Sequence, residues 1–274
     1  MVKATGEAWS RISVPVSGAA TEAEVLELAG RIAAAFNGQL NVMFAPPDPA
    51  ELAPWLGEGF MGTVQMSAID SLKAASEEGE LMARAQFSAL ACPGKSFSVL
   101  ASPVWQDLAF ETRLSDLVVF GDHAAKGQGL LSEAFQQVMM EERAGVFIAR
   151  KPFAIDGVAL VAWDGKEPSS RAARRSVPLL KKASKVVVAG APVGDAPADL
   201  SRLAAYYATH GLTVDIDILP KGDIVPALLE ANQRHGADYM VAGAFGRSRL
   251  REFAFGGTTR ALLHNTQLNL YMAH

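Results

Sequence analysis

Cysteine is almost absent from this chain: Cys92 is the only one among 274 residues. No disulfide can form within the chain, so an incidental or buried thiol in a reducing compartment is expected. The five histidines are scattered without the spacing that metal ligands need. With so few candidate ligands, neither a structural zinc site nor any other metal site is predicted.

Long hydrophobic runs and an excess of positive charge are also missing. No apolar run approaches the roughly 20 residues that a helix needs to cross a bilayer, and the N-terminal stretch MVKATGEAWSRISVPVSG lacks the apolar core of a signal peptide. The formal net charge is −4 and the isoelectric point is about 5.8, which disfavours nonspecific binding to nucleic acid or to anionic lipid. We therefore expect a soluble cytoplasmic protein that binds neither nucleic acid nor membrane.

Familiar catalytic motifs are missing as well. The nucleophile elbow G-x-S-x-G and the phosphate-binding loop G-x4-G-K-[ST] do not occur in the sequence. Ser248 lies in a glycine-containing stretch without a neighbouring base, so it is not assigned as a nucleophile. We predict no catalytic residue in this chain.

What the chain does contain is a regular alternation of short apolar runs and helix-like stretches. Hydrophobic residues make up 50% of the 274 residues, which suits two domains of ordinary size. Strands that alternate with helices imply right-handed crossovers and a mostly parallel sheet covered on both faces. In the second half, strands are expected at residues 158–163, 185–191, 212–218, 239–242 and 268–271, and helices at residues 168–183, 197–209, 222–235 and 257–265.

The first half repeats the same order of elements. Asp116 corresponds to Asp238, and the same 122 positions separate the matching fifth strands. In the first strand Ile12 corresponds to Ala159, 147 positions on, so the first half holds 25 additional residues (147 minus 122). The repeat predicts two tandem doubly wound open parallel sheets of five strands each, of Rossmann-like α/β type. The first-half strands are expected at residues 11–16, 39–44, 96–101, 116–120 and 145–149.

Two features divide the chain. The additional residues are placed in a longer connection at residues 45–76, which opens with the proline-rich stretch APPDPAELAPW. Pro152 follows the fifth strand and marks the join between the two copies. The predicted domains are therefore residues 1–151 and residues 152–274.

Glycines and one acidic residue gather where a parallel sheet binds ligands, outside the carboxyl ends of its strands at the reversal of strand order. Asp164 directly follows the first strand of the second half, and its carboxylate suits ribose hydroxyls. Gly243 follows the fourth strand, and Gly257 stands at the next helix start, where backbone N–H groups and the positive helix end can bind phosphate. The predicted contacts of a mononucleotide are Asp164, Ala242, Gly243, Gly246, Arg247, Gly256, Gly257 and Thr258.

The pattern G-x2-G-x9-G after a fourth parallel strand resembles the universal stress protein family. Asp164 matches the family's acidic residue after the first strand. By this resemblance the second copy binds ATP or a related adenine nucleotide, with Mg²⁺ as a candidate accompanying ion. The protein would then act as a stress-response regulator or switch, with slow ATP hydrolysis at most. The family most often has Ser or Thr where this chain has Gly257, so Thr258 or Thr259 is expected to supply the missing oxygen. The three motif glycines are Gly243, Gly246 and Gly256.

The first copy departs much further from this motif. Gly257 corresponds to Phe135, whose side chain would crowd a phosphate, so we expect this copy to have lost nucleotide binding. Single-domain universal stress proteins dimerise through their last strands. The resemblance therefore implies that residues 146–149 pair with residues 268–271 in an intrachain pseudo-dimer, and a homodimer of whole chains stays open. The counterparts of Gly243, Gly246, Gly256 and Asp164 are Gly121, Ala124, Ala134 and Ser17.

Two other functions stay open. One is an interaction module of the same fold that binds no nucleotide and recognises protein partners through its arginines and the connection at residues 45–76. The other is an enzyme that activates a substrate as an adenylate. Such an enzyme would need a motif such as S-G-G-x-D-S after the first strand, where this chain has DGKEPSS. A preparation that carries no nucleotide and is not stabilised by ATP would favour the interaction module.

Overall fold

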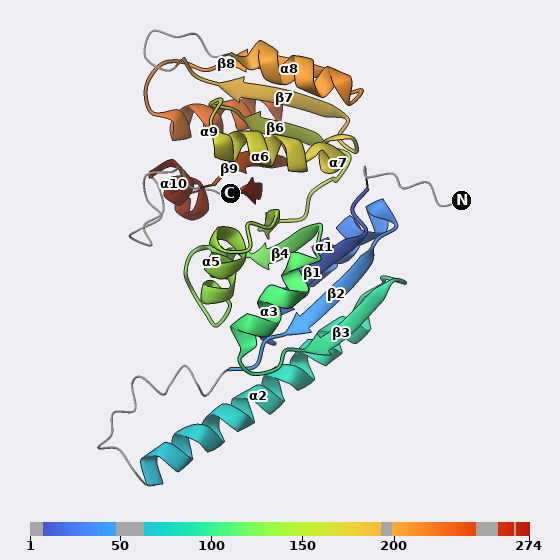
Figure 1. Cartoon of the computed structure of the whole chain (residues 1–274), viewed down its shortest axis with the longest axis vertical. Coiled ribbons are helices and arrows are strands. Elements are labelled where there is room, and N and C mark those ends of the chain that lie inside the picture. The colour runs from blue at the N-terminus through green and yellow to red at the C-terminus, as the bar shows by residue number, and fades with distance from the viewer. Residues whose placement is uncertain (1–7, 48–62, 193–198, 245–256, 266) are drawn as a thin grey trace. The chain divides into compact units, whose positions relative to one another are not determined.

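The computed structural model describes residues 8–47, 63–192, 199–244, 257–265 and 267–274. It divides into two compact units. The N-terminal unit comprises Ser10–Glu142, and the C-terminal unit comprises Arg143–His274 together with the residues up to Trp9. In Figure 1 the colour runs from blue through green in the first of these and from green to red in the second.

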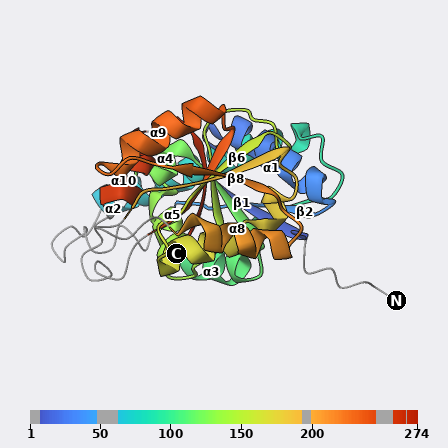
Figure 2. The ribbon, with the colours of Figure 1, turned by 90° about the horizontal axis from the view of Figure 1, so that it is seen from above.

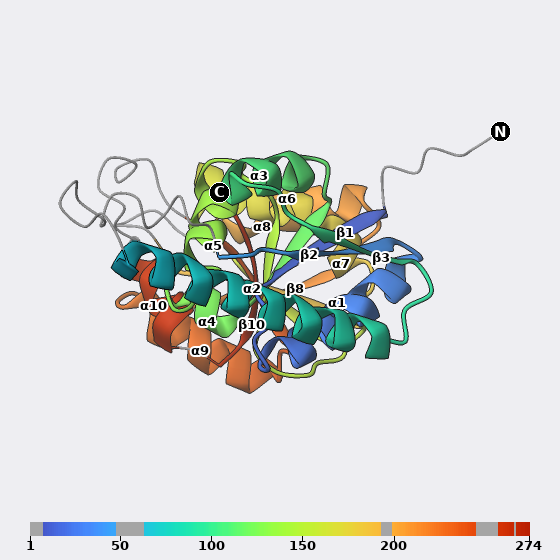
Figure 3. The same ribbon diagram turned by 90° about the horizontal axis from the view of Figure 1, so that it is seen from below.

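The N-terminal unit is a parallel sheet covered by helices. Its described elements are β1 (Arg11–Val16), α1 (Glu22–Phe36), β2 (Gln39–Phe44), α2 (Thr63–Ala89), β3 (Lys95–Val99), α3 (Val104–Arg113), β4 (Leu117–Gly121), α4 (Asp122–Ala125) and α5 (Ser132–Met140). The strand order is β3-β2-β1-β4. Helix α1 contacts α2, and α3 contacts α5. Figure 3 shows α3 on the opposite side of the sheet from α1 and α2, so both faces are covered.

The C-terminal unit has a similar plan and also contains β5, the last strand of the first sequence copy. Its described elements are β5 (Val146–Ala149), β6 (Val158–Ala162), α6 (Glu167–Arg175), α7 (Val177–Leu180), β7 (Lys185–Gly190), α8 (Leu200–Thr209), β8 (Val214–Ile218), α9 (Ile224–His235), β9 (Tyr239–Gly243), α10 (Gly257–Asn265) and β10 (Asn269–Ala273). The strand order is β8-β7-β6-β9-β10-β5. Tyr207 of α8 donates to the carbonyl of Ala173 in α6, while α9 contacts α10. Figure 2 shows α8 and α9 on opposite sides of the strands.

The last strands of the two sequence copies pair with each other. β5 and β10 run antiparallel, with Ile148 opposite Leu270 and Val146 opposite Met272. Every residue of both strands is buried. The intrachain pairing that the resemblance implied is therefore confirmed. Each strand covers a hydrogen-bonding edge of the other that would otherwise be open to pairing with another chain.

Local sequence signals set the ends of several elements. Asp223 caps α9 by accepting the amide N–H of Val225 at 3.2 Å, and Gly236 ends the helix in a left-handed conformation at φ +60°. Asn37 ends α1 in the same way at φ +51°. Inner strands such as β1 and β7 are buried after their first residue, whereas the outermost strands β3 and β8 are partly exposed, as expected for the edges of a parallel sheet.

The predicted strands are confirmed to within two residues at each end. Two expectations about helices need correction. The single helix expected at residues 168–183 is two helices, α6 and α7, because Pro178 has no amide N–H to continue the first one. Residues 63–76, expected in a long connection, form the first half of α2, while residues 48–62 lie outside the described ranges.

No helix in the described ranges is long and apolar enough to cross a bilayer.

Candidate functional site

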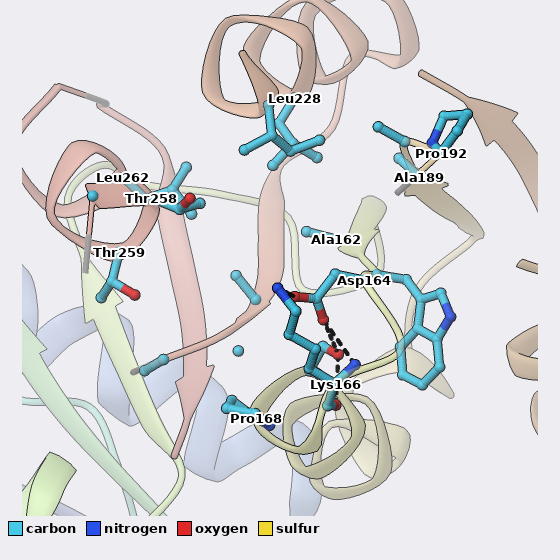
Figure 4. Close-up of a pocket in the computed structure, with 18 of the residues that line it drawn as sticks. Ala162, Asp164, Lys166, Pro168, Ala189, Pro192, Leu228, Thr258, Thr259 and Leu262 are labelled. Carbon is cyan, nitrogen blue, oxygen red and sulfur yellow. Dashed lines mark hydrogen bonds and ion pairs between the residues drawn. The ribbon is translucent and has the colours of Figure 1, made fainter. Parts of the chain in front are cut away.

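A cavity of about 500 Å³ lies at the carboxyl ends of β6, β7 and β9 in the C-terminal unit. The starts of α6 and α10 and the first turns of α9 complete its wall, as Figure 4 shows. The strand order reverses between β6 and β9, which is where open α/β sheets bind ligands. The volume is within the usual range for small-molecule sites.

Five of the eight residues predicted to contact a nucleotide line this cavity. They come from the end of β6, the end of β9 and the start of α10, which are far apart in the sequence. Because the carboxyl ends of parallel strands meet at one edge of a sheet, the fold brings these three segments together. The five are Asp164, Ala242, Gly243, Gly257 and Thr258. Gly246, Arg247 and Gly256 lie outside the described residues, and ligand contact by any of the eight stays a prediction.

Asp164 is held at the mouth of the cavity by the start of α6. Its Oδ1 accepts the hydroxyl of Ser169 at 2.6 Å and the amide N–H of Lys166 at 3.0 Å. Its Oδ2 lies 3.4 Å from the ammonium of Lys166. The side chain is 46% exposed and lines the cavity, so α6 holds the carboxylate while it remains accessible to a ligand. The sequence interpretation included Asp164 and missed Ser169 and Lys166.

Gly243 is explained by packing within the protein. A Cβ at this position would lie 2.4 Å from the amide nitrogen of Ser169 and 2.6 Å from the carbonyl carbon of Pro168. The first turn of α6 therefore crosses the end of β9 at a distance that only glycine permits. The same close approach places the start of α6 beside the cavity, so this glycine shapes the site even before any ligand is considered.

The start of α10 brings backbone N–H groups to the cavity. Gly257 and Thr258 are exposed, and Thr259 is buried. The first amide N–H groups of a helix have no partner within it and carry the positive end of the helix dipole. No described atom lies within 4 Å of a Cβ built on Gly257, so the position has room for a side chain. This end of the cavity suits an anion.

The wall of the cavity across from Asp164 is apolar. Ile224 and Leu228 of α9 line it together with Pro192, which follows β7. Trp163 lies at the rim, where its indole N–H donates to the carbonyl of Asp199 at 3.1 Å. The cavity therefore combines an apolar wall with a carboxylate and a helix start, which suits a ligand that has a flat ring and an anionic group. Sequence reasoning missed the α9 residues because an apolar helical position has the same pattern whether it faces a core or a cavity.

Arg150 holds the other end of α10. Its guanidinium donates to the carbonyl oxygens of Leu268 at 2.9 Å and Leu262 at 3.3 Å, and also to that of Leu263. Its own amide N–H donates to Asn269 Oδ1 at 2.8 Å. A cation at a helix C-terminus satisfies carbonyls that have no partner in the helix and opposes the dipole. Arg150 directly follows β5, so the last strand of the first copy anchors the helix that begins at the cavity.

The first copy has its carboxylate in a different place. Gly18, the counterpart of Gly165, has the same left-handed turn, with φ +86° against +72°, which supports the 147-residue alignment. Glu22, at the position of Ser169, accepts the Ser17 hydroxyl at 2.8 Å and the amide N–H groups of Ser17, Gly18 and Ala19 at 2.9 to 3.1 Å. Burial outweighs these hydrogen bonds and raises the pKa of Glu22.

Phenylalanines fill the space that corresponds to the cavity. Phe120 stands at the position of Ala242 and Phe135 at that of Gly257. Their rings meet edge to face at 5.4 Å between centroids, and each side chain is 1% exposed. Helix α2 also covers the loop, since a Cβ on Gly18 would lie 2.2 Å from the carbonyl oxygen of Gly79. Phe135 is thus part of the buried core, and the loss of nucleotide binding by this copy stays a prediction.

In the described ranges, no group of three or more His, Cys, Asp or Glu side chains is placed to hold a metal ion.

Comparisons with known proteins agree on the fold. No protein-family model matches the chain, and no curated protein matches it by sequence. The chain is similar to the crystal structure of a universal stress protein from Archaeoglobus fulgidus DSM 4304, with a TM-score of 0.63 and 18% identity over 96% of this chain and 97% of that one. A structure from Pseudomonas aeruginosa UCBPP-PA14, provisionally named a universal stress protein, gives a TM-score of 0.57 and 14% identity over 97% and 93% of the two chains.

A protein of unknown function from Pseudomonas aeruginosa PAO1 is also similar, with a TM-score of 0.56 and 12% identity over 97% of this chain and 92% of that one. These likenesses extend over nearly the whole of each chain. The chain therefore has the fold of universal stress proteins, and its two tandem copies are consistent with that fold.

Proposed function

We propose that this chain is a tandem universal stress protein whose C-terminal unit binds an adenine nucleotide, ATP first among them, and that it acts as a nucleotide-dependent regulator of a stress response. One observation carries the proposal. Asp164, Ala242, Gly243, Gly257 and Thr258, chosen as nucleotide contacts from the sequence, all line one cavity at the switch point of the sheet.

Each part of the cavity suits one part of a nucleotide. The carboxylate of Asp164 accepts hydrogen bonds from the ribose hydroxyls, because it lines the cavity and its side chain is 46% exposed. The N–H groups at Gly257 and Thr258, with the positive end of α10, bind the phosphates. The apolar wall formed by Ile224 and Leu228 packs on the base.

The first copy has a structural role in this proposal. Phe120 and Phe135 fill its counterpart of the cavity, and Glu22 takes up the loop N–H groups that face it. Its last residues hold the second copy through the β5–β10 pairing and Arg150. One nucleotide is therefore expected per chain.

The test measures bound nucleotide directly. Protein purified without added nucleotide is denatured, and the released small molecules are identified by mass spectrometry; ATP titration by calorimetry follows on stripped protein. Asp164→Ala is compared with Asp156→Ala, which removes the same charge at the opposite end of β6. We expect about one nucleotide per chain in the wild type and in Asp156→Ala, and a loss of affinity in Asp164→Ala.

If no nucleotide is released and millimolar ATP neither binds nor raises the melting temperature, the proposal is wrong. The interaction module that binds no nucleotide would then be the better account of the fold.

A further inference from the structure

A lysine side chain shares the cavity with Asp164. Lys166 lines the wall at the start of α6, and its ammonium lies 3.4 Å from Asp164 Oδ2. Figure 4 shows the side chain extending beside Asp164, with Thr258 and Thr259 across the cavity. Among the described residues, the two hydrogen bonds to Asp164 both go to Oδ1, so Lys166 contacts the oxygen that accepts neither of them.

The ion pair between Lys166 and Asp164 is easily exchanged. The lysine side chain is 68% exposed and that of Asp164 is 46% exposed. Exposed pairs of this kind contribute little to stability, because water screens the charges and two side chains must be ordered. A ligand whose hydroxyls bind Oδ2 can therefore displace the ammonium without a large cost, and the ammonium then remains in a cavity that also contains the ligand's anionic part.

We propose that Lys166 pairs with the phosphate chain of the bound nucleotide and so makes the site selective for phosphorylated over unphosphorylated ligands. This inference rests on the proposed function and names the part of the ligand that is recognised. Gly257, at the start of α10, has no hydroxyl to offer. The ammonium of Lys166, from the other side of the cavity, adds a charged contact to those that α10 supplies.

The fold needs the backbone of Lys166 and not its side chain. Its carbonyl accepts the amide N–H of Ser170 at 2.9 Å and the hydroxyls of Ser169 and Ser170 at 2.9 and 2.8 Å, and its amide donates to Asp164. All of these contacts survive a change of side chain. Lys166→Gln therefore removes the charge while it keeps the start of α6 and the position of Asp164.

The experiment compares ligands that differ only in phosphate number. Adenosine, AMP, ADP and ATP are titrated by calorimetry into the wild type, Lys166→Gln and Lys185→Gln. The control removes the same charge from an exposed ion pair, Lys185 with Asp215 at 2.9 Å, at the amino end of β7. We expect Lys166→Gln to weaken ATP binding roughly ten-fold, as for one lost charge-assisted contact, and to leave adenosine affinity within about two-fold.

The variant should also weaken the salt dependence of ATP binding, because one screened charge contact has been removed. Lys185→Gln should match the wild type for every ligand.

Three results would overturn the inference. An equal loss for adenosine and ATP would mean that Lys166 only positions Asp164. Unchanged affinity for all four ligands would mean that its ammonium is merely solvated. If the wild type binds none of the four, the proposed function fails and this inference fails with it, whereas the first two results leave nucleotide binding itself intact.

Discussion

The two copies of the repeat have the same strand order but differ at the carboxyl ends of their strands. In the second copy these ends surround a cavity of about 500 Å³. In the first, Phe120 and Phe135 pack edge to face at the corresponding positions and are buried. At these two positions, aromatic side chains that are part of the core stand where the second copy has Ala242 and Gly257 beside a cavity.

The two copies also differ in the loop after the first strand. In the second copy an acid on the loop accepts the hydroxyl of Ser169 from the helix, while in the first copy an acid on the helix, Glu22, accepts the hydroxyl of Ser17 from the loop. The carboxylate and the hydroxyl have exchanged positions. The local hydrogen bond is preserved, but the carboxylate of Glu22 is turned toward three backbone N–H groups, and that of Asp164 faces the cavity.

The largest expected effect is on the free energy of unfolding, through a buried ring of the first copy. Phe120→Ala should lower the free energy of unfolding by about 3–5 kcal/mol, because it removes a buried ring and leaves a cavity. Phe110→Ala is the matched control. Its ring is 57% exposed and interacts with the Arg113 guanidinium at 5.3 Å, so its loss should cost about 1 kcal/mol or less. Urea denaturation measures both, and equal costs would contradict the packed-core account.

Next in size is the pair of glycines that end β9 and β4. Gly243→Ala should destabilise the protein by about 1–3 kcal/mol, because the new Cβ would lie 2.4 Å from a backbone nitrogen that cannot move alone. At Gly121 the nearest atom is a methyl of Val25 at 3.1 Å, which a small side-chain movement relieves. Gly121→Ala should therefore cost clearly less. Thermal denaturation of the two variants measures both costs. If Gly121→Ala proved more destabilising than Gly243→Ala, α6 would not cross β9 so closely.

A smaller effect is expected from restoring a hydroxyl to the cavity. Gly257→Ser places an oxygen at the start of α10, where space is open and serine suits a helix N-terminus. ATP affinity should rise by roughly ten-fold if the hydroxyl reaches a phosphate, as for one hydrogen bond to a charged group. Calorimetry tests this change. An unchanged affinity with an intact fold would place the phosphates elsewhere in the cavity.

The smallest expected effects are in the pH dependence of stability, and the two units should differ in sign. The pKa of Glu22 is raised above its ordinary 4.5, so the folded N-terminal unit binds this proton more tightly than the unfolded chain does. Its contribution to the free energy of unfolding is therefore largest at low pH and falls as pH rises above 4.5. The stability difference between wild type and Glu22→Gln should fall over the same window.

Asp217 in the C-terminal unit should behave in the opposite way. Burial raises its pKa, but contacts with the Arg234 guanidinium and with His235 Nε2 at 2.7 Å outweigh burial and hold the pKa below its ordinary 3.8. Its contribution is present above pH 3.8 and is lost as pH falls through the lowered pKa. Urea denaturation of wild type and Asp217→Asn between pH 2 and pH 6 tests this. A difference that is flat with pH would contradict the assigned contacts.

Much of the fold could be predicted because buried parallel strands are continuous apolar runs with recognisable ends. The prediction of a single helix at residues 168–183 is wrong, because Pro178 interrupts a stretch whose other residues fit a helical pattern. Within the candidate site, Asp164 and Gly257 could be named because each stands directly beside a strand end or helix start. Ser169, Lys166 and Leu228 could not, because a helical position does not reveal which neighbour it faces.

The amino-acid sequence alone determined the tandem repeat, the alternation of strands and helices along the chain, and the acid and glycines that stand beside strand ends and a helix start. These depend on hydrophobic periodicity and on residue types with restricted backbone roles, which are local properties. Only the tertiary structure decided that the crossing of α6 over β9 requires glycine at Gly243. It also decided that the Lys166 ammonium pairs with Asp164 at the cavity and that Arg150 binds the carbonyl oxygens at the end of α10. Such contacts depend on distances of a few ångströms between segments that are remote in sequence, and packing sets those distances.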